Sequence, residues 1–147
     1  MDRSPLPAVG SVSRGSAVGV HLLADLTGVA PAPLCDEARL RGCLLAAAAA
    51  AHLHPVAAPC LHRFPGGGLT GFLLLAESHI AFHSYPECGY LAVDIFTCGA
   101  TDPAAALAVF LDSLAPGGQR ITRVGRGSMT VTAGVPAGAT AATLAGA

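Results

Sequence analysis

Several short stretches of the chain are rich in apolar, β-branched and aromatic residues and are separated by segments with Gly and Pro, a pattern typical of β-strands. We expect strands at residues 17–26, 55–63, 69–77, 79–84, 90–97 and 120–132. Two further stretches favour helices, 35–51 through its alanine run and 103–115 through an apolar stripe. A glycine-rich loop at 65–68 and a Pro-Glu-Cys-Gly turn at 86–89 separate the central strands.

Both predicted helices begin with favourable residues. Asp36 and Glu37 lie in the first turn of one, where a negative charge suits the helix dipole. Asp102 is the expected N-cap of the other, with Pro103 at its first position. The resulting order, β-α-β-β-β-β-α-β, predicts an α+β two-layer sandwich with an antiparallel sheet and helices on one face.

A chain of 147 residues corresponds to a single domain. Residues 1–16 are rich in Pro, Gly, Ser and Arg, and we expect a flexible arm there. The domain itself is expected over 17–132. Residues 133–147 consist almost entirely of Ala, Gly and Thr, which predicts a disordered tail.

The composition is unusually apolar for a small domain. Charged residues make up 12% of the chain and hydrophobic residues 52%, whereas about 25% charged residues is usual. We therefore expect part of the surface to be covered by another subunit. The net charge of −1 gives no reason to expect nucleic acid or a membrane surface as a partner. Five cysteines without a CxxC pair favour a reduced, cytoplasmic setting.

Reactive groups gather in one stretch, residues 73–99. Ser78 follows Glu77, His83 lies five residues further on, and Cys98 lies twenty residues after Ser78. The chain contains no lysine, since all eight basic residues are arginine. A lysine-bound pyridoxal phosphate mechanism is therefore excluded, and any carbonyl needed for amine chemistry must come from elsewhere.

The stretch LLLAESHIAFHSYPECGYLAVDIFTCG resembles the cleavage-site region of the small prokaryotic S-adenosylmethionine decarboxylase proenzymes. HLLADLTG at 21–28, LHRF at 61–64 and GLTG at 68–71 match the same family in the same order. The resemblance implies self-cleavage between Glu77 and Ser78, which would give fragments 1–77 and 78–147. It also implies an enzyme that makes the aminopropyl donor for spermidine, assembled as a dimer of cleaved protomers that forms a larger sandwich.

The resemblance further implies roles for individual residues. Ser78 would become a covalent pyruvoyl group that forms a Schiff base with the substrate, S-adenosylmethionine. His83 would be the base that removes the α-proton of Ser78 during processing, and the hydroxyl of Thr70 would stabilise the oxyanion. Cys98 would be the general acid that protonates the decarboxylated product, since a thiol is mostly protonated at neutral pH.

Three residues are expected to bind substrate by the same resemblance. Phe64 would stack on the ligand or contact its sulfonium, and Glu87 would accept the ribose hydroxyls. Tyr85 stands where the family usually has tryptophan, and Cys88 replaces a frequent aromatic residue. These two departures leave a second hypothesis open, a pyruvoyl-dependent arginine or ornithine decarboxylase. A third hypothesis is an uncleaved, non-catalytic paralogue that regulates an active partner.

A metal site is the last alternative. His52-x-His54 and Cys60-x-His62 place four metal-binding side chains within eleven residues. Their spacing fits no standard zinc module, and Pro55 separates the two pairs. The sequence therefore favours ordinary helix-end and strand histidines, and we expect no metal.

Overall fold

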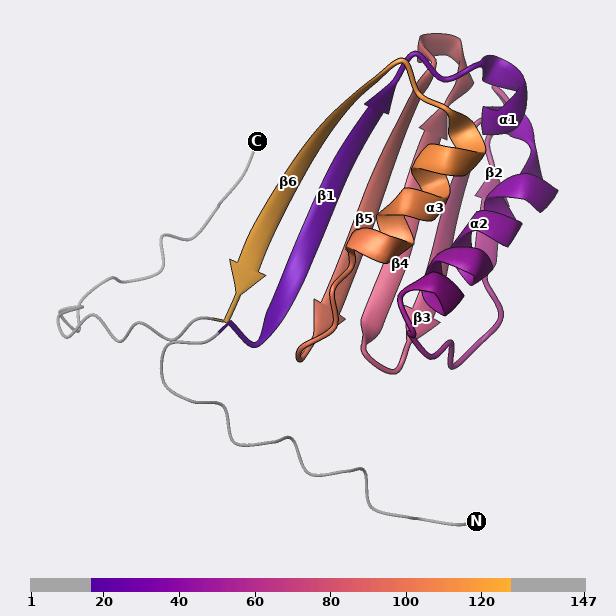
Figure 1. Ribbon diagram of the computed structural model, residues 1–147. Coiled ribbons are helices and arrows are strands. Elements are labelled where there is room, and N and C mark those ends of the chain that lie inside the picture. Colours follow the sequence, from indigo (N-terminus) through magenta and orange to yellow (C-terminus); the bar gives the residue numbers. More distant parts are fainter. Residues whose placement is uncertain (1–16, 128–147) are drawn as a thin grey trace, which may run out of the picture.

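The computed structural model describes residues 17–127, which form one antiparallel sheet with helices on one of its faces (Figure 1). The strands are β1 (Gly19–Thr27), β2 (Cys60–Arg63), β3 (Leu69–Leu75), β4 (Ser78–Tyr85), β5 (Tyr90–Cys98) and β6 (Gly118–Arg126). The helices are α1 (Pro31–Cys35), α2 (Glu37–Ala50), the 3-10 helix η1 (Pro86–Cys88) and α3 (Ala104–Leu114). The strand order is β2-β3-β4-β5-β1-β6. The predicted α+β two-layer architecture is therefore confirmed, while the arm at 1–16 and the tail at 133–147 lie outside the described residues.

Alternation along the strands builds the core between the sheet and the helices. On β5, Leu91, Val93 and Ile95 are fully or almost fully buried, while the residues between them are only partly covered. Phe82 of β4 meets Phe110 of α3, with ring centroids 6.5 Å apart and both side chains fully buried. These aromatic side chains join the two layers, because each buries a large apolar area.

Close packing also explains Gly71 on β3. A Cβ atom at this position would lie only 2.2 Å from a carbon atom of the Phe82 ring. No side chain fits there, so the glycine lets the Phe82 ring lie directly against the backbone of the neighbouring strand.

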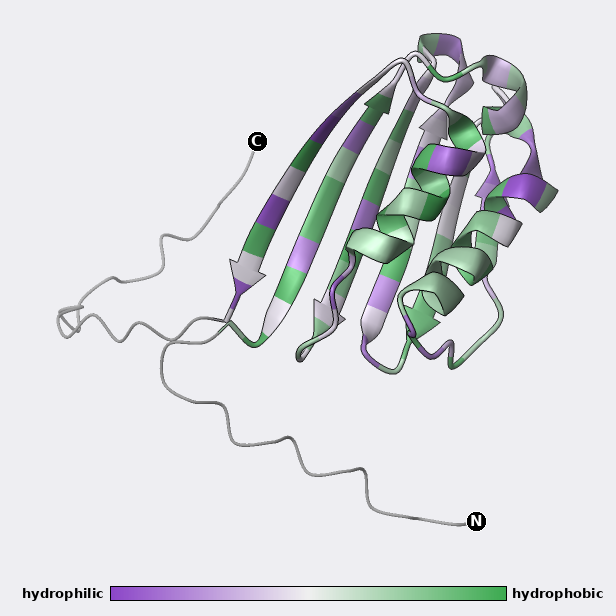
Figure 2. Ribbon diagram, viewed as in Figure 1, coloured by the Kyte–Doolittle hydropathy of each residue, from purple (hydrophilic) through white to green (hydrophobic). Residues whose placement is uncertain are grey.

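Hydrophobic residues recur along the strands of the sheet (Figure 2), and some of them lie on the face that points away from the helices. Phe72, Leu74, Tyr85 and Val124 on this open face are exposed although they are hydrophobic. Helices α1, α2 and α3 lie on the opposite face (Figure 1). Apolar patches of this kind are common at contacts with another protein surface.

The structure corrects several element boundaries. The short helix α1 was not predicted, because its sequence PAPLC contains two prolines. Pro31 lies in the first helical turn, where a backbone N–H has no hydrogen-bond partner within the helix, so its absence breaks no bond. The strand expected at 55–63 covers only Cys60–Arg63, preceded by a single bridge between Pro55 and Leu75. Proline has no N–H to donate to a ladder, which shortens this edge strand.

The predicted start of α3 is wrong by one residue. The helix begins at Ala104 with Pro103 as its N-cap residue, and Asp102 still accepts a hydrogen bond from the Ala104 backbone N–H at 3.1 Å. Strand β6 begins earlier than expected, at Gly118, and residues 128–132 of the predicted strand lie outside the described chain.

Candidate active site

The bond between Glu77 and Ser78 lies at the tight turn that joins β3 to β4. Ser78 pairs with Leu75 across this turn and with Thr97 of β5 on its other side. Its φ angle is +155°, a value that residues with a side chain seldom adopt. Strain of this kind persists only where the surroundings enforce it, and it is concentrated at functional sites.

The carbonyl group of Glu77 is held from the side of β5. The backbone N–H of Cys98 donates a hydrogen bond to the Glu77 carbonyl oxygen at 3.1 Å. The same contact brings the exposed Cys98 thiol to the end of the sheet where Ser78 lies. Because Ser78 is bonded to this carbonyl carbon, the N–H points at the oxygen that would become negative if the serine hydroxyl attacked.

The carboxylate of Glu77 is held by His54, in the segment that follows α2. The backbone N–H of His54 donates to one carboxylate oxygen at 3.0 Å, and Nδ1 of its ring lies within hydrogen-bonding distance of the other. Burial acts to raise the pKa of Glu77, but the hydrogen bonds from His54 outweigh it and lower the pKa below its usual value. Sequence reasoning missed this role of His54 and weighed the residue only as a metal ligand.

A second histidine at this end contacts the serine itself. Nδ1 of His79 lies 3.1 Å from the Ser78 hydroxyl oxygen. The ring stacks on Phe72 of β3, with centroids 5.5 Å apart and an interplanar angle of 21°. Sequence reasoning did not assign His79 to the site, although its position next to Ser78 was the available signal.

The other expected residues gather at the opposite end of β4. The Thr70 hydroxyl lies 2.8 Å from Nδ1 of His83. Both residues line a cavity of about 500 Å³. The remaining residues around this cavity are Phe64, Gly66, Gly68, Ser84, Tyr85 and Glu87. The structure thus brings together the three residues expected to bind substrate and the two expected to assist processing.

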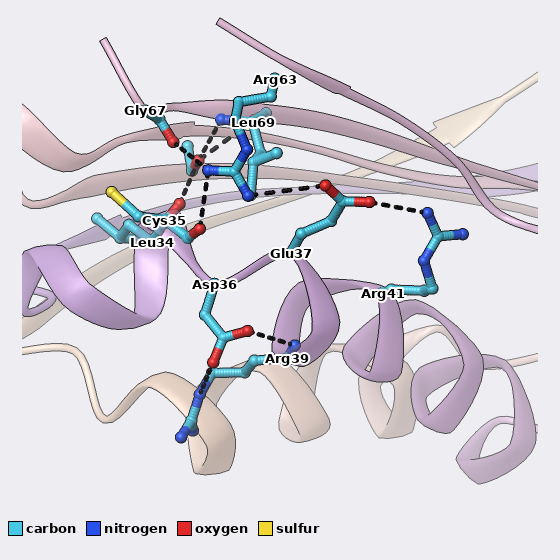
Figure 3. Close-up of polar contacts among 10 residues, drawn as sticks. Leu34, Cys35, Asp36, Glu37, Arg39, Arg41, Arg63, Gly67 and Leu69 are labelled. Carbon is cyan, nitrogen blue, oxygen red and sulfur yellow. Dashed lines mark hydrogen bonds and ion pairs between the residues drawn. The ribbon is translucent and has the colours of Figure 1, made fainter. Parts of the chain in front are cut away.

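The glycine-rich loop that lines this cavity is anchored by Arg63 (Figure 3). Its guanidinium donates to the carbonyl oxygen of Cys35 at 3.0 Å and to that of Gly67 at 3.4 Å. It also lies 3.6 Å from a carboxylate oxygen of Glu37, which in turn pairs with Arg41. These contacts tie the loop next to Phe64 to α1 and α2.

The expected site is divided between two places within one chain. His83 follows Ser78 by five residues on the same strand, and a rise of about 3.3 Å per residue separates them by about 16 Å. A proton is transferred directly only over hydrogen-bonding distance, about 3 Å. One copy of the chain therefore places Glu77, Ser78 and Cys98 at one end of the sheet and Thr70, His83 and the cavity at the other.

Residues 17–127 contain no group of three or more His, Cys, Asp or Glu side chains arranged to hold a metal ion. None of their helices is both long enough and apolar enough to cross a membrane.

Comparison with known proteins gives a consistent result. The family model for S-adenosylmethionine decarboxylase matches residues 20–127. An S-adenosylmethionine decarboxylase proenzyme of Parasynechococcus marenigrum is 48% identical over 100 residues, which cover 66% of this chain and 76% of that one. One of Pyrobaculum aerophilum is 39% identical over 108 residues, covering 73% and 86%. The crystal structure of the adenosylmethionine decarboxylase from Aquifex aeolicus superposes with a TM-score of 0.70 at 33% identity, covering 76% of this chain and 92% of that one.

Proposed function

Because the chain belongs to the S-adenosylmethionine decarboxylase family, we propose that it cuts itself between Glu77 and Ser78 and then decarboxylates S-adenosylmethionine. The observation that carries this proposal is the geometry of the turn. A strained serine follows a carbonyl group that already accepts a backbone hydrogen bond from Cys98. Attack of the Ser78 hydroxyl on that carbonyl needs no diffusion, since the two groups are covalently adjacent.

Processing would turn Ser78 into the carbonyl group that this lysine-free chain lacks. The attack exchanges the peptide bond for an ester, and removal of the Ser78 α-proton then releases the first fragment. Hydrolysis of the resulting dehydroalanine gives a pyruvoyl group and ammonia. The pyruvoyl carbonyl supplies an electron sink for the carbon–carbon bond that breaks when carbon dioxide leaves. The Cys98 thiol, at the same end of the sheet, would protonate the product.

Substrate would bind in the cavity at the other end of β4. Its volume of about 500 Å³ lies within the usual range for small-molecule sites. The exposed Phe64 ring offers a flat apolar surface, and Glu87 offers a carboxylate for paired hydroxyls. These groups suit a nucleoside with a sulfonium better than a short basic amino acid, so we do not favour the arginine or ornithine alternative. The intact Ser78, His83 and Cys98 likewise disfavour a regulatory paralogue.

A second copy of the chain would complete the site. Thr70 on β3 and His83 on β4 lie at the cavity end of the sheet. Cys98 lies at the turn end, beside Ser78. By strand alternation, the side chains of Thr70, His83 and Cys98 point to the open face. A two-fold axis through the middle of this face would bring the turn end of one protomer onto the cavity end of its partner. The exposed Phe72, Leu74 and Val124 side chains would be buried in the same contact. We infer a dimer in which each active site contains residues of both protomers.

The five free cysteines support the proposal of a reduced, cytoplasmic setting.

Intact mass tests the proposal directly. Purified protein should consist of fragment 1–77 and a fragment beginning at position 78 with a pyruvoyl group in place of serine. The S78A variant should remain a single chain, which controls for proteolysis. Carbon dioxide release should be seen with S-adenosylmethionine and not with arginine or ornithine. A wild-type chain that stays whole under active conditions would contradict the proposal.

A further inference from the structure

His79 is the histidine that touches the serine at which the chain is cut. Its Nδ1 lies 3.1 Å from the Ser78 hydroxyl oxygen, within hydrogen-bonding distance. His83, on which family resemblance places the processing base, lies about 16 Å away along the same strand. Within residues 17–127, the imidazole that hydrogen-bonds to the Ser78 hydroxyl is therefore that of His79.

Aromatic neighbours hold the His79 ring in this position. Phe72 of β3 stacks against one face of the ring at 5.5 Å, and Phe96 of β5 approaches edge-on at 6.2 Å. His21 of β1 approaches edge-on at 6.3 Å. Side chains from β3, β5 and β1 thus hold the imidazole beside Ser78. A proton-accepting group held in position in this way needs no rearrangement before the proton is transferred.

The surroundings also keep His79 neutral. Burial is the largest effect and lowers the pKa of His79; the charge of His21 lowers it further, while Asp94 of β5 acts in the opposite direction. Arg126 of β6 lies beyond His21, 3.2 Å from its Nδ1. A neutral imidazole near neutral pH has a free lone pair and can accept a proton.

We propose that His79 is the base that takes the Ser78 hydroxyl proton in the first step of self-cleavage, whereas His83 of the partner copy serves the later removal of the α-proton. This proposal rests on the proposed function and divides its two proton transfers between two histidines. It assigns to His79 a catalytic role because its ring contacts a reacting atom.

The step balances without any further reactant. The Ser78 O–H bond breaks as its proton moves to Nδ1 of His79, and the oxygen forms a bond to the Glu77 carbonyl carbon. The former carbonyl oxygen becomes an anion that accepts the Cys98 N–H. The carbon–nitrogen bond then breaks, the imidazolium returns its proton to the nitrogen of Ser78, and an ester remains beside a neutral His79.

The variants H79N and H79Q test the proposal. An asparagine oxygen can still accept a hydrogen bond close to the position of Nδ1, but an amide cannot take up a proton at neutral pH. Both variants should lose precursor at least about a hundredfold more slowly than the wild type, the usual contribution of a general base. H52N, which changes an exposed histidine just after α2, is the matched control and should be processed normally.

Hydroxylamine identifies the step that is blocked, because it cleaves esters much faster than peptide bonds. The H83A precursor should accumulate an ester that hydroxylamine cuts at position 78, whereas the H79N precursor should resist it. In the wild type, ester formation should slow as the pH falls through a midpoint below the ordinary histidine value of 6.5, because protonated His79 has no free lone pair.

The outcomes separate this proposal from the function on which it rests. A wild-type chain that is never cut contradicts the proposed function itself. A wild-type chain that is cut, together with an H79N chain that is cut at the same rate, overturns only the role of His79. Ester accumulation in H79N would also overturn it, since the first step would then proceed without this base. If either H79N or H79Q fails to fold, the other variant still tests the role of His79.

Discussion

Mixed dimers of two inactive chains test whether His83 acts on the serine of the partner. H83A retains Ser78 but lacks the proposed processing base, and S78A retains that base but lacks the serine. The separation of about 16 Å along β4 is roughly five times the reach of direct proton transfer. Neither variant should form a pyruvoyl group alone, but co-expression should restore it.

The expected yield follows from the symmetry of the dimer. With equal expression and random pairing, half of the dimers are mixed, and in each of these one chain has its Ser78 opposite an intact His83. About a quarter of all chains should therefore carry the pyruvoyl group. Intact mass measures this fraction when one variant carries a tag, and the tag should show that only H83A chains are cut.

A base that acts within its own chain gives a different result. H83A would then remain without a pyruvoyl group however many mixed dimers form. Mixed dimers that are isolated through two different tags and contain no cut H83A chain would refute the shared site. Cut chains in H83A alone would refute the role of His83 altogether.

Three further predictions concern the cavity, the core and a surface cluster. R63A should raise the KM for S-adenosylmethionine about three- to tenfold with little change in kcat in steady-state assays, because the loop loses its anchor. R41A is the control, because it removes a charge from the same network without contacting the loop. F82A should lower the free energy of unfolding by about 3–5 kcal/mol, because the ring is fully buried, and urea unfolding of the precursor measures this loss. The hydrogen bond to Asp25, followed by burial, raises the pKa of Tyr90 to about 12. The contribution of this bond to the free energy of unfolding is fully present just below pH 10 and is lost as the pH rises toward 12. D25N should lower the pKa of the Tyr90 phenol, measured by NMR titration of carbon-labelled tyrosine.

The strand at 90–97 could be predicted because β-branched and aromatic residues are enriched there. In the structure, Leu91, Val93 and Ile95 form the buried face of β5. The turn at 86–89 sets the register of β4 with β5, so Ser78 lies opposite Thr97. This register explains why two residues twenty positions apart, Ser78 and Cys98, meet at the same end of the sheet.

Other features could not be predicted from residue types alone. Helix α1 has the sequence PAPLC, and its two prolines disfavour a helix in any position after the first turn. The contact between His54 and Glu77 joins residues 23 positions apart through an irregular segment, for which no local pattern exists. Such contacts depend on tertiary packing alone.

The division of the site was not predicted from the sequence, although the spacing of Ser78 and His83 was an available signal. Ser78 and His83 lie five positions apart along one extended segment, and a strand of that length holds them about 16 Å apart. A base five residues along a strand therefore cannot serve the serine of its own chain, whatever the motif suggests. Only a neighbour of Ser78 or a second copy of the chain can do so.

In the proposed mechanism the two histidines would fill these two roles, and together they would make processing depend on assembly. His79 contacts Ser78 within one chain, so ester formation would need no partner. Removal of the α-proton would need His83 of a second protomer, brought to Ser78 across the open face. A chain that has folded but not yet paired would therefore stop at the ester, where the peptide bond can re-form. Irreversible cleavage would follow only once the dimer that contains the complete substrate site exists.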